Sequence, residues 1–175
     1  DGRLRYLTHE EWEKLSPFLM EKGQYLHDMA SLALNTGLRP KEIFKLTPGH
    51  LDFDRGLILC VDTKTKESNH AYMNKVAREI LVRRSLACRR YIFEHGEGDP
   101  YVGVPRAFGA AVEEAGLNDE VDDRRFKATF YTLRHTFASW LVISGVPIYT
   151  VKELMRHKNI QMTARYAKLS PEVQL

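Results

Sequence analysis

Residues 130–140 read FYTLRHTFASW, and this stretch decides how the rest of the sequence is interpreted. Its spacing is typical of a helix with one apolar stripe, whose members recur at i, i+4, i+7 and i+8: Leu133, Phe137, Trp140 and Leu141. Tyr131 and Arg134 stand beside that stripe, so the pattern predicts an arginine at the margin of a buried helix. Because an arginine near a packed core usually has an anionic partner, we expect Arg134 to meet a negative charge.

The length and composition are those of a single globular domain. The 175 residues are 43% hydrophobic and 28% charged, which is enough for a hydrophobic core. We find neither an apolar run long enough to span a membrane nor a signal peptide, so we expect no membrane partner and a cytoplasmic location. Cys60 and Cys88 are far apart, which favours a reducing compartment and no metal site. The first residue is Asp1, so we expect a fragment of a longer chain.

Basic residues are concentrated toward the end of the chain. The net charge is only +3, but residues 131–168 contain six basic residues and one acidic residue, Glu153. Acidic residues instead crowd residues 112–123. This asymmetry favours a polyanionic partner, with nucleic acid the leading candidate.

Cap and turn residues predict a mainly α fold with one small antiparallel β-hairpin (α+β). Thr8 is a typical N-cap, Gly37 a typical left-handed C-cap, and Pro40 suits the first turn of a helix. Two strand-like runs, 56–61 and 70–73, flank a polar, lysine-bearing tip. The predicted helices are residues 9–19, 25–35, 40–46, 75–91, 105–115, 132–144, 148–156 and 160–167.

Four separated pieces of sequence carry residues suited to phosphate chemistry. Each piece alone is compatible with an ordinary surface charge or a residue at the rim of the core. They are Thr36–Arg39 followed by Glu42, the hairpin Lys64, the motif Tyr131-x-x-Arg134-His135, and His157 with Tyr166 nine residues later.

Taken together and in this order, the pieces resemble the catalytic domain of tyrosine recombinases, the phage integrase family. The matching stretches are TGLRPKEIFKL, VDTKTKESN, YTLRHTFASWLVISG and ELMRHKNIQMTARYAKL, and the resemblance extends over residues 7–169. It implies the fold of DNA breaking-rejoining enzymes, with residues 1–175 as a single catalytic domain. The N-terminal DNA-binding domain of the family is expected to be absent from this chain.

The resemblance implies that Tyr166 is the nucleophile. Its phenol would attack a DNA phosphodiester and form a 3′-phosphotyrosyl bond, which conserves bond energy, so that religation needs no ATP, metal or other cofactor. Arg39 and Arg134 would clamp the non-bridging oxygens, where the transition state gathers negative charge. His157 would also bind the scissile phosphate, and Lys64 would protonate the leaving 5′ oxygen. Lys66 is the alternative general acid, because the register of a hairpin is easily misread.

Position 131 departs from the family pattern, in which a histidine usually precedes the x-x-Arg. A phenol titrates near pH ~10 and an imidazole near ~6.5, so a tyrosine is a poor base but still a hydrogen-bond donor. Our hypothesis is that Tyr131 keeps the phosphate contact and loses proton-transfer efficiency. His135 is interpreted as a packing histidine, because it is rotated ~100° from Arg134 around the helix. Glu42 is expected to orient its neighbours, with a solvent-facing role as the alternative.

The expected partner is double-stranded DNA in a bacterial host, bound by a homotetramer of the full-length protein, with a monomer expected for this fragment. The predicted activity is site-specific DNA recombination or integration. A transposase, an invertase, a chromosome-dimer resolvase and a non-catalytic helical DNA-binding protein remain alternatives. Basic residues predicted to contact DNA phosphates are Arg83, Arg84, Lys152, Arg156, Lys158 and Arg165.

Overall fold

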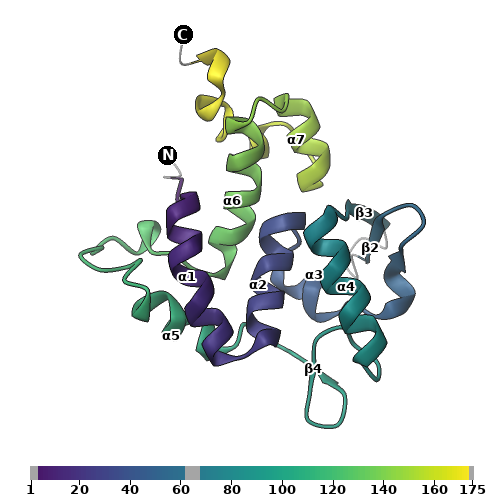
Figure 1. Ribbon diagram of the computed structural model, residues 1–175. Coiled ribbons are helices and arrows are strands. Elements are labelled where there is room, and N and C mark those ends of the chain that lie inside the picture. The colour runs from purple at the N-terminus through teal and green to yellow at the C-terminus, as the bar shows by residue number, and fades with distance from the viewer. Residues whose placement is uncertain (1–3, 62–67, 174–175) are drawn as a thin grey trace.

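The structure is a computed structural model that describes residues 4–61 and 68–173 (Figure 1). These residues are mostly helical with small antiparallel sheets, so the predicted fold class is confirmed. The helices are α1 (His9–Lys22), α2 (Gln24–Thr36), α3 (Pro40–Phe44), α4 (Lys75–Ala87), α5 (Arg106–Glu114), α6 (Phe130–Ile143), α7 (Ile148–Met155) and α8 (Gln161–Ala164). Short 3-10 turns are η1 (Pro48–His50), η2 (Arg124–Phe126), η3 (Ala167–Leu169) and η4 (Pro171–Val173). The strands are β1 (Leu51–Asp52), β2 (Leu57–Val61), β3 (Ser68–Tyr72), β4 (Glu94–His95) and β5 (Asp99–Pro100).

The two helix caps predicted from the sequence are confirmed. At the start of α1, the Thr8 hydroxyl accepts from the Glu11 backbone N–H, and the Glu11 carboxylate accepts from the Thr8 backbone N–H. This capping box satisfies two donors that the first turn would otherwise leave unpaired. At the end of α2, Gly37 adopts φ 70°, the left-handed conformation that glycine accepts without strain.

Helix α2 is the centre of the molecule. It packs against α1, α4 and α6, and Figure 1 shows it between α1 and the α3–α4 region. A buried carboxylate, Asp28, pairs with both Arg83 and Arg84 of α4 at 2.8 and 2.9 Å, which fixes α4 on α2. The fully buried apolar side chains of α2 are Leu26, Met29, Ala30, Leu32 and Ala33.

The predicted hairpin is present as β2 and β3, within a three-stranded antiparallel sheet. Leu59 pairs with His70 near the middle of the hairpin, and β1 adds a short third strand beside β2. The sequence did not reveal β1 or the separate pair β4–β5, because strands of two residues carry no periodicity. Strand β3 packs against α7. Lys64 and Lys66 lie outside the described residues.

Among the helices that end earlier than predicted, the largest differences are at α4 and α8. Helix α4 ends at Ala87 rather than near residue 91, because Cys88 has extended backbone and the Glu94 carboxylate accepts the backbone N–H groups of residues 89–91. The last predicted helix, 160–167, is shorter in the structure: α8 ends at Ala164, and the 3-10 turn η3 follows from Ala167. The break between them places Tyr166 at a turn between two short elements.

Helix α6 is buried on more sides than its apolar stripe indicates. Leu133 is fully buried, whereas Phe137 and Trp140 are only half-buried. Arg134, predicted at the margin, is 5% exposed. The reason is that α2 covers one side of α6 while α7 and η3 cover another, which a single-stripe pattern does not anticipate.

No helix within residues 4–61 and 68–173 is both long and apolar enough to cross a membrane.

Gly37 offers a direct test of the packing between α2 and α6. A Cβ at this position would lie 2.5 Å from Cδ1 of Phe137, and φ 70° disfavours a side chain. We expect Gly37→Ala to lower the free energy of unfolding by about 1–3 kcal/mol, measured by urea denaturation. Gly109→Ala is the matched control, because Gly109 is helical with nothing within 4 Å of its Cβ direction. It should raise stability by about 0.5–1 kcal/mol, and equal stability of the two variants would contradict this account.

Candidate active site

Side chains from several separate elements line one open cleft of about 750 Å³. Arg39 comes from the start of α3, three residues come from α6, and the rest come from the last residue of α7 and the segment that follows it. The described part of the chain therefore brings together five of the six predicted catalytic residues, Lys64 being outside it. The predicted site residues that line the cleft are Arg39, Tyr131, Arg134, His135, His157, Arg165 and Tyr166.

Arg134 is the most deeply placed charge of the cleft. Its guanidinium donates to the backbone carbonyls of Gly37, at the end of α2, and of Met155, at the end of α7, the latter at 2.7 Å. Burial, followed by repulsion from Arg39 and Arg156, lowers the pKa of Arg134 to about 10. The group stays protonated at neutral pH, and its two acceptors are neutral. This end of the cleft therefore attracts an anion.

Arg39 is held by Glu42 in the first turn of α3. The Glu42 carboxylate accepts the Arg39 backbone N–H at 2.7 Å and the Arg39 Nη1 at 3.2 Å. The same carboxylate accepts Nη2 of Arg156 at 2.6 Å. Glu42 is 19% exposed, so the structure favours the predicted orienting role over the solvent-facing alternative.

Tyr166 lies against His135 and not against solvent. The ring is 1% exposed, and its hydroxyl oxygen is 2.6 Å from Nδ1 of His135. Burial, followed by Arg165 and Arg134, lowers the pKa of His135 to about 4, so the imidazole is neutral at neutral pH. Burial also raises the pKa of Tyr166. In the tautomer that carries its proton on Nε2, His135 can accept a hydrogen bond from the protonated phenol at Nδ1.

The interpretation of His135 as a packing residue missed its contact with the Tyr166 hydroxyl. It compared His135 with Arg134, one position away, whereas the informative comparison is with Tyr131, four positions away. Residues at i and i+4 lie on the same face of a helix. Both side chains line the cleft, with Tyr131 50% exposed and His135 covered by Tyr166.

His157 lines the same cleft, close enough to Arg134 to be affected by its charge. Its Nδ1 is 2.6 Å from the hydroxyl oxygen of Thr163, a fully buried residue that the sequence did not single out. Burial, followed by Arg134 and Arg39, lowers the pKa of His157 to about 4. With Nδ1 engaged by Thr163, Nε2 is the ring atom left for a ligand. The only sequence signal for Thr163 is its position three residues before Tyr166.

The predicted DNA-contacting residues fall into three groups. Lys158 and Arg165 are exposed, and the Arg165 guanidinium lies 6.0 Å from the centre of the Tyr166 ring. Lys152 and Arg156 form the second group, in which each basic side chain is paired with a carboxylate, Lys152 with Glu153 at 2.9 Å on α7. Arg156 is a correction: its side chain is 4% exposed and paired with Glu42, so it does not present its charge to a partner on the surface.

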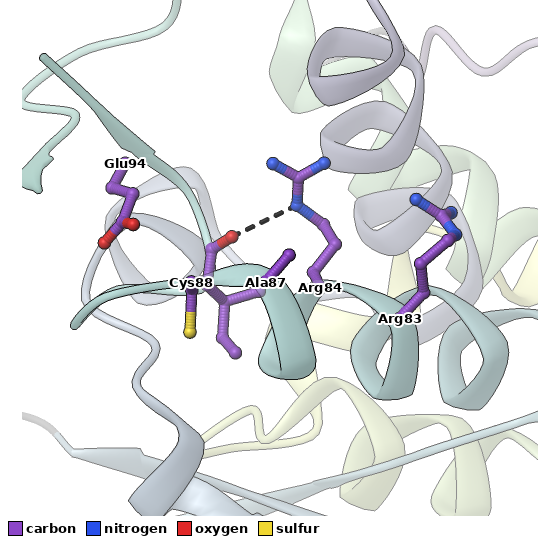
Figure 2. Close-up of a pocket in the computed structure, with 6 residues that line it drawn as sticks. Arg83, Arg84, Ala87, Cys88 and Glu94 are labelled. Carbon is purple, nitrogen blue, oxygen red and sulfur yellow. Dashed lines mark hydrogen bonds between the residues drawn. The ribbon is translucent and has the colours of Figure 1, made fainter.

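Arg83 and Arg84 form the third group and lie next to a smaller pocket of about 270 Å³. Figure 2 shows both side chains rising from the same helix, with Cys88 and Glu94 nearby. Both guanidiniums bind Asp28, and Arg84 Nε also donates to the Ile92 carbonyl at 3.1 Å. These contacts fix α4 in the fold. Binding of DNA by the two arginines stays a prediction.

A search for a metal site among the described residues finds no group of three or more His, Cys, Asp or Glu side chains.

A model of the phage integrase family matches residues 5–172. The chain belongs to the phage integrase family. The resemblance inferred from the four sequence pieces is therefore confirmed. Within this family, the integrase of Salmonella phage P22 is 31% identical over 185 aligned positions, covering 97% of this chain and 45% of the P22 protein. Tyrosine recombinase XerC of Lacticaseibacillus casei is 26% identical, covering 77% of this chain and 47% of XerC.

Solved integrase structures have the same fold. The catalytic domain of bacteriophage HP1 integrase matches with a TM-score of 0.73 at 24% identity, over 97% of this chain and 90% of that domain. The Tn1549 transposon integrase, in complex with circular intermediate DNA, matches with a TM-score of 0.77 at 23% identity, over 92% of this chain and 61% of that one. The chain thus spans less than half the length of these two curated relatives and most of the HP1 catalytic domain.

Because burial lowers the pKa values of several histidines, we expect the free energy of unfolding to fall in mild acid. The pKa values of His135 and His157 are lowered to about 4, and burial also lowers the pKa of His27. The unfolded chain therefore binds protons first as the pH falls, and stability present above about pH 6.5 is lost toward about pH 4. Urea midpoints measured between about pH 7.5 and about pH 4.5 should fall steadily.

His157→Asn is the matched variant for this measurement. It removes one of the titrating groups, so its midpoint should depend less steeply on pH than that of the wild type. The lowest pH is kept near 4.5 because the carboxyls of Glu11 and Asp28, whose pKa values are lowered, remain ionised there. A wild-type midpoint that does not change over this range would contradict the neutral, buried state of the histidines.

Proposed function

We propose that the protein is a site-specific DNA recombinase that cuts and rejoins DNA through Tyr166. The observation that carries this proposal is the shared cleft: a tyrosine hydroxyl, two arginines and a histidine converge on it from segments far apart in sequence. Two guanidiniums suit the non-bridging oxygens of a phosphodiester, and the phenol suits attack on its phosphorus. The names of its relatives, an integrase and a tyrosine recombinase, support the same activity.

In the cleavage step, the Tyr166 oxygen forms a bond to phosphorus, and the bond from phosphorus to the 5′ oxygen breaks. Arg39 and Arg134 stabilise the charge that gathers on the non-bridging oxygens, and His157 donates to the same phosphate. Lys64, which lies outside the described residues, supplies the proton for the leaving 5′ oxygen. A 5′ hydroxyl from a second duplex then attacks the 3′-phosphotyrosine and releases Tyr166, so strand exchange needs no ATP.

His135 is the nearest acceptor for the proton of the Tyr166 phenol, at 2.6 Å. In the free protein its basicity is reduced by burial and by the charges of Arg165 and Arg134. A phosphodiester bound in the cleft would offset the charges of Arg134 and Arg165 and make the imidazole more basic. Proton removal from Tyr166 is thereby coupled to the arrival of DNA, and the phenol stays protonated without it.

Tn1549 integrase was captured with DNA in the matching structure, and this supports duplex DNA as the partner of the present chain. Integration, transposition, inversion and dimer resolution share this chemistry, and we propose integration because the P22 relative is an integrase. A non-catalytic DNA-binding protein is the alternative from another class. The feature that favours it is Tyr131, which stands where a catalytic histidine was expected.

Replacement of the nucleophile tests the activity. The full-length protein, incubated with chelator on a nicked duplex that carries its recombination site, should form a covalent protein–DNA band in denaturing electrophoresis. Tyr166→Phe should abolish the band, because no phenol oxygen remains to bond phosphorus. Tyr91→Phe is the matched control, since Tyr91 lies beside Arg90 after α4 and should retain the band. Absence of the band for the wild type would refute the proposal.

Substitutions at position 131 test how the cleft tolerates a phenol there. Tyr131 is half exposed at the cleft, so an imidazole fits the same space. Tyr131→His should cleave at least as fast as the wild type, because an imidazole adds proton-transfer capacity. Tyr131→Phe should be slower by about tenfold, because one hydrogen bond to the phosphate is lost. Single-turnover cleavage rates measure both. An inactive Tyr131→His together with an unaffected Tyr131→Phe would contradict the hypothesis.

A further inference from the structure

Arg156 has a backbone conformation that its residue type does not favour. It ends α7 with φ 55° and ψ 42°, the left-handed region in which helices usually place glycine. Among the described non-glycine residues, Glu120 is the other with positive φ. A side chain in this region costs about 1 kcal/mol or more.

The Arg156 guanidinium is buried beside the phosphate clamp. Its side chain is 4% exposed, and Nη2 donates to Oε2 of Glu42 at 2.6 Å. Its Nη1 is buried without a hydrogen-bond partner among the described residues. The repulsion between Arg156 and Arg134 that lowers the pKa of Arg134 places the two guanidiniums in one electrostatic cluster.

Glu42 binds its two arginines unequally. The contact from Arg156 is 2.6 Å, whereas the side-chain contact from Arg39 is 3.2 Å. The shorter contact is the stronger charge-assisted hydrogen bond. Arg39 therefore remains loosely held and 34% exposed, with its guanidinium at the cleft.

Without Arg156, the Glu42 carboxylate would have Arg39 as its one described cationic partner. A carboxylate and a guanidinium prefer two parallel hydrogen bonds, and that pairing would turn Arg39 toward Glu42 and neutralise its charge. An arginine already paired in this way is a weaker ligand for phosphate. The 2.6 Å contact with Arg156 prevents this pairing.

The same turn of chain also supports Arg134. Met155, which precedes Arg156, provides the carbonyl that accepts Nη2 of Arg134 at 2.7 Å, and His157 follows directly. Arg156, whose backbone is left-handed, thus lies between Met155, which accepts from Arg134, and His157, which lines the cleft. The Arg156 side chain extends to Glu42, the carboxylate that contacts Arg39.

We propose that Arg156 is a positioning residue for the phosphate clamp: by occupying Glu42, it keeps Arg39 free to bind the scissile phosphate. This inference rests on the proposed recombinase function. Arg156 acts through Glu42 and Arg39 and does not touch the substrate.

Arg156→Gly tests the role directly, because glycine accepts φ 55° and keeps the turn that presents the Met155 carbonyl. Single-turnover cleavage by the full-length protein on its nicked site should slow by about tenfold or more. The urea midpoint should stay at or above the wild-type value, since the backbone strain is relieved. Arg156→Lys keeps a positive charge near Glu42 and should restore part of the rate.

Glu42→Gln separates positioning from a purely structural role. In that background no carboxylate remains to capture Arg39, so Arg156→Gly should slow cleavage much less than in the wild-type background. An equal loss in both backgrounds would overturn the proposal, as would a rate within twofold of wild type for Arg156→Gly alone.

Inorganic phosphate provides a readout that does not require DNA cleavage. Titrated calorimetrically into the protein at constant ionic strength, it should bind several-fold more weakly to Arg156→Gly than to wild type, with a smaller difference when Glu42→Gln is present. Equal phosphate affinities would overturn the inference. A wild type that binds phosphate but never forms the covalent band would refute the recombinase function and leave the clamp result standing on its own.

Discussion

The buried guanidinium of Arg134 is the interaction on which the cleft depends. It joins three helices, because it starts on α6 and donates to carbonyls at the ends of α2 and α7. Carbonyls at helix C-termini lack intrahelical partners, so one arginine satisfies acceptors on two helices at once. These acceptors carry no formal charge. The protein therefore retains a buried positive charge that a bound anion would compensate.

Burial and the charges around Arg134 together set the protonation of the neighbouring histidines. Burial, followed by the charges of the arginines, lowers the pKa values of His135 and His157 to about 4. Both imidazoles are neutral as a result, and the Nδ1 of each lies beside a hydroxyl group, of Tyr166 and of Thr163 respectively. A neutral imidazole can accept a hydrogen bond, so His135 is available as an acceptor for the phenol. The charges of Arg165 and Arg134 oppose the effect of burial on Tyr166, whose pKa is raised.

Local signals explain what the sequence could predict. The cap at Thr8, the left-handed Gly37 and the arginine–histidine pair on α6 depend on near neighbours, so short patterns reveal them. The convergence of Arg39 with Tyr166 was predicted only because the order of motifs resembles a known family. Composition and periodicity do not show which distant segments meet.

The misjudged residues depend on contacts that only the folded chain provides. Arg156 reads as a surface charge, because a left-handed non-glycine residue has no sequence signature, and its partner Glu42 lies far away in the chain. Arg134 was expected at the margin of the buried face of α6, and it is buried because α2, α7 and η3 cover that helix. In both cases the missing information is which element packs beside the helix.

Tyr131 and His135 would divide two roles that the family pattern gives to one histidine, the phosphate contact and proton transfer. Tyr131 and His135 are four residues apart on α6 and line the same cleft, with Arg134 between them. Tyr131, half exposed, is accessible to an incoming phosphate and offers a hydroxyl donor. His135, covered by Tyr166, contacts the phenol that would lose a proton. With tyrosine at position 131, an imidazole still contacts Tyr166, the proposed nucleophile, so the departure from the family pattern does not by itself indicate lost activity.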